Sequence, residues 1–197
     1  MMYEYTDKVI AKLDRVIARE FSNAKRTVLA FDEVNVIRKA VNECYATILT
    51  ATKKAYRDIA RHAYKAAGGD TVDVILLVDL VLKEYDPVTR YMFNTEYDRK
   101  RARAFENAVA TRSPADMNTA ARLLANQIHQ YADEVTDSAT LRAYKDTGVD
   151  LVQWVAEHDD RTCTECDDLD GTVYPIDKVP DKPHIRCRCQ FRPVKRP

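Results

Sequence analysis

The chain concentrates its chemically reactive side chains near its C-terminal end. Four of its five cysteines and one of its four histidines lie there, as Cys163, Cys166, His184, Cys187 and Cys189. Thiol and imidazole groups at this density can bind a metal ion, form disulfides or act as a redox centre. The sequence before residue 150 looks chemically plain, so this cluster indicates what chemistry the chain can support.

The spacing of these residues favours a metal site. Cys163 and Cys166 have the Cys-x2-Cys spacing of a zinc knuckle, in which backbone N–H groups of the turn hydrogen-bond to the sulfurs. Cys187 and Cys189 would point to the same face of an extended strand, and His184 precedes Cys187 by three residues. A tetrahedral site needs four ligands and five candidates exist, so the sequence leaves open which one is left out.

Compartment and size both favour a structural zinc ion. The N-terminal residues, from Met1 to Tyr5, lack the basic and apolar regions of a signal peptide, and no apolar run approaches the roughly 20 residues that cross a bilayer. We therefore expect folding in a reducing cytoplasm, where clustered thiols favour metal over disulfides. A module of about fifty residues buries too little apolar surface to be stable alone, and zinc would supply the missing stability.

Three alternatives to structural zinc stay open, namely a disulfide, thiols without metal, and a catalytic zinc with an open coordination position. The sequence contains no glycine-rich phosphate loop, no Ser-His-Asp arrangement and no zincin motif. We therefore expect no enzymatic activity and no small-molecule substrate.

The elements that would position the cluster follow from composition and periodicity. The 197 residues are 46% apolar and 31% charged, which is typical of a globular protein, and only four are glycine, which disfavours an all-β fold. We predict a mainly α fold with two regions. A multi-helix region covers residues 1–148, and a small α+β zinc-ribbon-like module of short antiparallel strands covers residues 149–197.

Apolar residues at helical spacing predict several helices before Gly148. The first carries Val9, Leu13, Ile17 and Phe21, and the second starts near Val34 and ends at Gly68-Gly69. Ser113 is a good N-cap for a later helix with Pro114 at its first position. The remaining predictions are helices over 71–82, 88–110 and 138–145, and strands over 150–157, 171–175 and 187–191.

Several isolated residues are weaker functional candidates. The net charge is zero, so no global basic field exists. The basic run 99–103 is expected to be a solvated helix face, and Cys44, His62, His129 and His158 are expected to be core, surface or loop residues. Phe93, Tyr97 and Trp154 could be exposed anchors but are better explained as core. The basic C-terminal tail is the better candidate for contacting DNA or an acidic partner, through Arg186, Arg188, Arg192, Lys195 and Arg196.

The order of these C-terminal residues resembles a known signature. Trp154, Asp160-Arg161-Thr162-Cys163-x2-Cys166, Leu169-Asp170-Gly171 and His184-x2-Cys187-Arg188-Cys189 follow one another as in the phage Mu F-like minor head protein family. This family is also called the head morphogenesis, or SPP1 gene-product-seven-like, family. The resemblance covers about residues 150–192, and the preceding helical region carries no motif of its own.

This resemblance implies a structural, non-enzymatic minor head protein of a tailed phage or prophage, acting in head morphogenesis near the portal. The implied partners are portal protein, major capsid or scaffold subunits and packaged double-stranded DNA, with no membrane partner. The implied location is the virion, in the head interior or at the portal vertex, after assembly in the host cytoplasm. The alternative is a zinc-ribbon nucleic-acid-binding protein that contacts packaged DNA.

Overall fold

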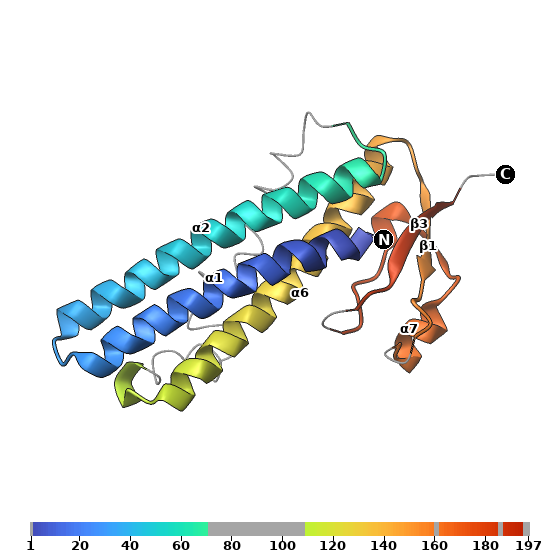
Figure 1. Cartoon of the computed structure of the whole chain (residues 1–197). Coiled ribbons are helices and arrows are strands. Elements are labelled where there is room, and N and C mark those ends of the chain that lie inside the picture. The colour runs from blue at the N-terminus through green and yellow to red at the C-terminus, as the bar shows by residue number, and fades with distance from the viewer. Residues whose placement is uncertain (1, 71–108, 160–161, 185–186, 195–197) are drawn as a thin grey trace. The chain divides into compact units, whose positions relative to one another are not determined.

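Three long helices and a small antiparallel sheet make up the described residues of the chain (Figure 1). The computed structural model describes residues 2–70, 109–159, 162–184 and 187–194. The predicted helix over 71–82 and almost all of the one over 88–110 lie outside these residues. The mainly α fold class with a small C-terminal strand module is confirmed. The elements are α1 (Met2–Ala30), α2 (Val34–Ala66), α6 (Pro114–Asp146), β1 (Leu151–Val155), α7 (Thr164–Leu169), β2 (Val173–Pro175), the 3₁₀ turn η2 (Ile176–Lys178) and β3 (Gln190–Val194).

The chain forms two compact units, and among the described residues the boundaries between them fall within α1, α2 and α6. The first unit contains Met1–Asp7, Arg57–Val81 and Ala132–Pro197, and the second contains Lys8–Tyr56 and Leu82–Tyr131. The division into a helical region over residues 1–148 and a Cys/His module over residues 149–197 stays a prediction.

The second unit is built from helices whose apolar stripes face inward. In α1 the stripe of Leu13, Ile17 and Phe21 is buried, as its spacing predicted. Tyr56 in α2 is also buried, and its hydroxyl donates a 2.7 Å hydrogen bond to the backbone carbonyl of Ile128 in α6. This bond satisfies a polar group inside an apolar core.

Helix α6 begins as predicted but runs further than predicted. The backbone N–H of Asp116 donates to the Ser113 hydroxyl at 3.3 Å, which is an N-cap contact. The prediction of a separate short helix over 138–145 is wrong, because α6 continues to Asp146. Apolar residues continue the buried face through this region, and the Thr140 hydroxyl donates to the Thr136 carbonyl at 2.8 Å without interrupting the helix.

The sheet belongs to the first unit and has the order β2-β1-β3, with both pairs antiparallel. β1 and β2 fall inside the predicted strands. β3 begins three residues later than predicted, at Gln190 instead of residue 187. The segment before it lies past the end of β1, because Gln190 pairs with Val155, the last residue of β1. The carbonyls of Cys187 and Cys189 accept hydrogen bonds from Lys182 and Tyr3.

The core of the first unit lies on one face of this sheet. Val152 and Trp154 of β1 are fully buried, and the Trp154 ring meets the Phe191 ring edge to face with centroids 5.2 Å apart. The Tyr144 hydroxyl of α6 donates to the Phe191 carbonyl at 3.3 Å. Three of the five candidate ligands, Cys166, Cys187 and Cys189, are buried in the same apolar cluster, and Cys163 packs against it. His184 is exposed. Among the helices of the described residues, none has the length and apolarity that a bilayer crossing requires.

Candidate metal centre

The first half of the candidate centre is a turn that leads into α7. Cys163 is the N-cap of α7, with extended backbone angles, and its sulfur accepts the backbone N–H of Cys166 at 3.4 Å. This is the N–H···S contact that the Cys-x2-Cys spacing predicted. The turn therefore directs the side chains of Cys163 and Cys166 toward the same point.

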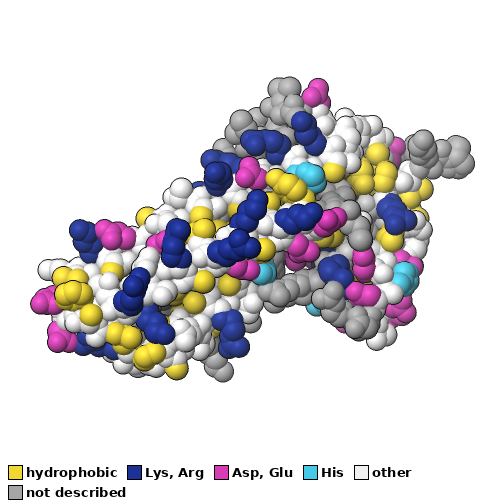
Figure 2. All heavy atoms as spheres, in the orientation of Figure 1, with side chains coloured by type: hydrophobic (Ala, Val, Ile, Leu, Met, Phe, Trp, Pro, Cys, Tyr) yellow, Lys and Arg dark blue, Asp and Glu magenta, His cyan; other side chains and the backbone are white. Residues whose placement is uncertain are grey.

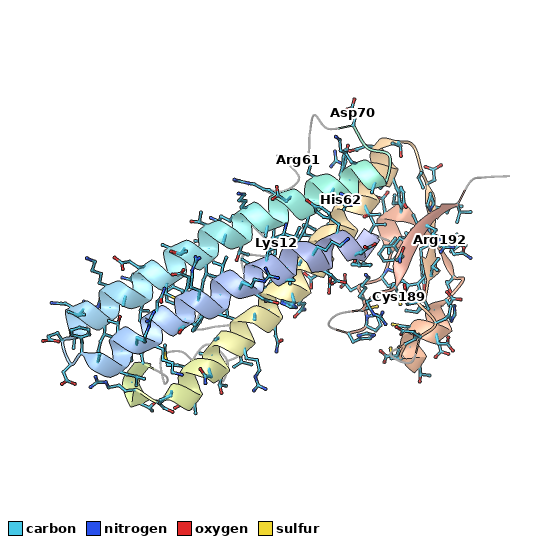
Figure 3. All side chains as sticks on the ribbon, in the orientation of Figure 1. Lys12, Arg61, His62, Asp70, Cys189 and Arg192 are labelled. Atoms are coloured by element: carbon cyan, nitrogen blue, oxygen red, sulfur yellow. The ribbon has the colours of Figure 1, made fainter. Side chains whose placement is uncertain are left out.

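The second half lies in the segment between η2 and β3. The Cys166 sulfur is 3.2 Å from Nε2 of His184 and 3.5 Å from the sulfur of Cys187. The five predicted donors form two overlapping groups of three, each with all its ligand atoms within 4.8 Å of one another, and Cys166 belongs to both. Figure 3 shows sulfur atoms gathered beside Cys189. The fold thus brings together all five donors from segments up to 26 residues apart, namely Cys163, Cys166, His184, Cys187 and Cys189.

The spacing and chemistry of these donors fit a zinc ion. Tetrahedral coordination with Zn–S bonds of about 2.3 Å places ligand sulfurs about 3.8 Å apart, close to the observed separation of Cys166 and Cys187. Thiolates with an imidazole are a donor set that zinc prefers to calcium or magnesium. The cluster can therefore hold a metal ion, with four ligands drawn from the five candidates.

Burial favours the neutral thiol form of these cysteines while no cation is bound. Cys166 and Cys187 are each 1% exposed, and Cys189 is 3% exposed. Burial raises the pKa of the Cys166 thiol, and hydrogen bonds with neighbouring cysteines raise it further. Burial also raises the pKa of Cys187, against the lowering effects of a backbone hydrogen bond from Cys189 and the charge of Lys182. A bound divalent cation would reverse this preference by stabilising the thiolates.

A buried charged network anchors the segment between η2 and β3, which we call the ligand segment, to the helices. The Lys182 ammonium lies 2.7 Å from a carboxylate oxygen of Asp137 in α6 and donates to the Cys187 carbonyl at 3.2 Å. Tyr3 in α1 donates to Asp137 and to the Cys189 carbonyl, and Lys182 also bonds to the Tyr3 hydroxyl. The network therefore fixes two backbone carbonyls of the ligand segment from α1 and α6.

The sequence did not reveal this network. Lys182 lies in a proline-rich loop and Asp137 follows Thr136 in a helix, positions where charged residues are usually solvated. Their side chains are instead 12% and 14% exposed. The contacts join residues up to 186 positions apart, so no local pattern could have indicated them.

The Leu169-Asp170-Gly171 turn has a structural role beside the cluster. Asp170 accepts the Ala156 backbone N–H at 2.7 Å and contacts Nε2 of His158 at 3.0 Å, and the first of these bonds lowers the pKa of Asp170. Gly171 adopts a φ of 75° and donates its N–H to the Trp154 carbonyl at 2.9 Å. The turn therefore fastens the chain after α7 to the end of β1.

A surface hollow of about 560 Å³ lies beside β1 and the Leu169-Asp170-Gly171 turn, lined by residues that include Gln153, Glu157, His158, Asp170 and Arg192. His158 and Asp170 contact each other in the turn that holds β1, so both have a structural role there. Arg192 lies opposite Gln153 in the β1–β3 ladder. The hollow brings together none of the predicted metal donors.

Two of the five basic tail residues lie among the described residues of the chain. Arg188 forms an ion pair with Asp159, which uses its guanidinium within the module. Arg192 is exposed on β3. Arg186, Lys195 and Arg196 lie outside the described residues, as does the basic run 99–103. Contact of this tail with DNA or an acidic partner stays a prediction.

The other isolated candidates have structural surroundings. Cys44 is buried on α2, and burial raises its pKa to about 12. His62 stacks on Tyr5 with ring centroids 3.9 Å apart, and Nε2 of His129 is 2.8 Å from a carboxylate oxygen of Asp14. Trp154 is a core residue, whereas Phe93 and Tyr97 lie outside the described residues.

The chain is similar to a known protein family over a segment longer than the cysteine cluster. A protein-family model described as Phage Mu protein F like protein matches residues 89–192, which is more than half of the chain. The match extends upstream of the C-terminal signature and includes all of α6, while α1 and α2 precede it. A search of curated proteins and a search of solved structures gave no match.

Proposed function

Because the chain belongs to the Phage Mu protein F like family, we propose that it is a structural, non-enzymatic minor head protein of a tailed phage or prophage. The observation that carries this proposal is the family match over residues 89–192, which includes the cysteine cluster and the α6 helix that supports it. Membership supports a phage head-related structural role and interaction with other head components. The more specific proposal is action in head morphogenesis beside the portal.

The proposed partners are portal protein and major capsid or scaffold subunits. The proposed location is the virion, in the head interior or at the portal vertex. Long helices with exposed polar faces can dock against such subunits. The burial of Cys166, Cys187 and Cys189 in an apolar cluster supports a structural role for these sulfurs.

We further propose that the cysteine cluster binds one structural zinc ion through four of its five candidate donors. In this proposal zinc holds the turn before α7 to the segment before β3. It would thereby add stability to a small sheet of three short strands. The Lys182–Asp137–Tyr3 network would then hold this module to the ends of α1 and α6.

The morphogenesis role can be tested by co-expression with the portal protein and the capsid subunits of the same phage. Wild-type protein should co-purify with portal or with procapsids. The variant Cys166→Ser should do so less, because Cys166 belongs to both groups of candidate donors. Cys44→Ala is the matched control, since Cys44 lies outside the cluster. If neither portal nor procapsid retains the wild-type protein, the proposed role loses its support.

The zinc proposal can be tested separately by native mass spectrometry of protein purified without chelator. We expect one zinc ion per chain in wild type and in Cys44→Ala. Five single variants, with each cysteine donor changed to Ser and His184 changed to Asn, should divide into four that lose zinc and one that keeps it. A metal-free wild-type protein would rule out the structural zinc.

A further inference from the structure

The charge of the chain is unevenly distributed among its helices. The whole sequence has 31 basic and 31 acidic residues. α1 alone has six basic against four acidic residues, and α2 has seven against two. Figure 2 shows Lys and Arg side chains gathered over the face formed by α1 and α2. The net charge of the whole chain is zero, but α1 and α2 together have a strong excess of positive charge.

Helix α1 carries these charges along one exposed face. Lys8, Lys12, Arg15 and Arg19 follow one another at intervals of four, three and four residues, which places them on one side of a helix, and Arg26 extends the row. All five are exposed. The other exposed residues between Lys8 and Arg26 are two alanines, a serine and an asparagine. We call these five basic residues the basic α1 face.

The acidic residues of this stretch of α1 only partly offset the basic face. Asp14 lies toward α6, where its carboxylate oxygen is 2.8 Å from His129. Glu20 is 16% exposed and pairs with Arg19 at 2.8 Å. Lys12 is labelled on α1 in Figure 3. The surface that a partner would meet is therefore positive over most of its length.

The length and composition of the face indicate the kind of partner. From Lys8 to Arg26 a helix rises about 27 Å, which matches about eight base pairs of duplex DNA at 3.4 Å each. Protein interfaces are anchored by buried aromatic or aliphatic side chains, and this face has none. Small residues between the basic ones let a phosphate backbone approach closely.

We propose that the basic α1 face binds the sugar–phosphate backbone of double-stranded DNA without reading its sequence. The face lies outside the family match, which begins at residue 89, so it is a property of this chain's first helix. It is also separate from the C-terminal tail for which DNA contact was predicted. The proposal does not depend on docking to portal, because it concerns a different region of the chain and a different ligand.

Fluorescence anisotropy of a labelled 20-base-pair duplex with the full chain tests the proposal. Four phosphate contacts predict that affinity falls on the order of 100-fold between 50 and 200 mM salt. The variant Lys8→Gln/Lys12→Gln/Arg15→Gln/Arg19→Gln should bind at least tenfold more weakly at 50 mM salt, with a flatter salt dependence. Two duplexes of unrelated sequence should bind with equal affinity.

The matched control removes four exposed charges elsewhere, as Arg38→Gln/Lys39→Gln/Lys65→Gln/Lys178→Gln. It should keep most of the affinity, and circular dichroism should show that both variants remain helical. Equal loss in both variants, or no duplex binding by wild type, would overturn the proposal. Displacement of DNA by equimolar polyglutamate would also overturn it, in favour of an acidic protein partner. Portal co-purification of the α1 variant would show that a negative DNA result does not reflect a misfolded protein.

Discussion

Among the described residues of the first unit, Lys182 and Asp137 form an ion pair with both side chains largely buried. Burial raises the pKa of Asp137, while Lys182 and Tyr3 lower it, so the carboxylate depends on its partners to remain charged. Removing one member of a buried ion pair leaves the other charge without compensation. The side chains that hold the ligand segment are therefore expected to be as sensitive to substitution as the ligands themselves.

Replacing Lys182 with Met should reduce the free energy of unfolding by about 3–5 kcal/mol, because Asp137 is left buried without its cation. The double variant Lys182→Met/Asp137→Asn should be more stable than Lys182→Met. Urea unfolding with a double-mutant cycle measures both values. Additive effects of the two substitutions would show that the pair is not coupled.

The surroundings of Asp146 make its contribution to stability depend on pH. The hydrogen bond from Tyr64 lowers the pKa of Asp146, and the hydrogen bond and charge of Arg142 lower it further. A carboxylate with a lowered pKa stabilises the fold above its unfolded pKa of about 3.9, and this stabilisation disappears as the pH falls through its folded pKa.

Wild type should therefore be more stable than Asp146→Asn near pH 6, and this difference should shrink as the pH is lowered below about 4. The urea midpoints of both proteins, measured from pH 6 to pH 3, give the comparison. A difference that stays constant with pH would show that the Asp146 charge does not contribute.

At the scale of elements, the sequence predicted the helix and strand boundaries that depend on local residue patterns. Apolar spacing located α1 and α2, and the Ser113 N-cap with Pro114 located the start of α6. Gly68, with a φ of 90°, ends α2 where it was expected. The break in α6 was wrong because Asp137 and Ser138 resemble a helix start, whereas tertiary burial of the same face keeps the helix intact. β3 was misplaced because β1 ends at Val155, opposite Gln190, and the local sequence does not indicate where a partner strand ends.

The candidate site was predicted in the same uneven way. The Cys-x2-Cys turn and its N–H···S contact follow from spacing within four residues, so the sequence indicated them. The approach of Cys166 to His184 and Cys187 depends on how α7 packs against the segment before β3. The Tyr3, Asp137 and Lys182 contacts arise from three elements distant in sequence, and periodicity carries no information about such pairings.

The turn after α6 offers a test of one element boundary. Gly148 has a φ of 80°, and a Cβ atom there would meet nothing within 4 Å. Gly148→Ala should therefore cost only backbone strain, about 1 kcal/mol. Gly148→Asn should cost less than Gly148→Ala, because asparagine tolerates this conformation better. Thermal unfolding of both variants measures the order, and a larger loss for Asn would contradict the argument.

At the scale of the whole molecule, one residue reports on the proposed zinc module. Trp154 is the single tryptophan of the chain and packs in the same cluster as Cys166, Cys187 and Cys189. Its fluorescence therefore reports on the surroundings of the candidate site, while circular dichroism is dominated by the long helices.

Removing metal with a chelator in mild urea should shift the Trp154 emission to longer wavelength, because loss of the ion opens the core around it. Most of the helical circular dichroism should remain. Added zinc should restore the emission, and magnesium should not. Simultaneous loss of both signals would show that the module and the helices unfold as one.

The hydrogen bond from Tyr3 to the carbonyl of Cys189 also has a consequence for protein synthesis. These residues are 186 positions apart, so the first turn of α1 cannot reach its final environment until the ribosome has produced nearly the whole chain. At bacterial synthesis rates this wait is about 10 seconds or more. During that time the helices can form, but the first residues translated are among the last to form their native contacts.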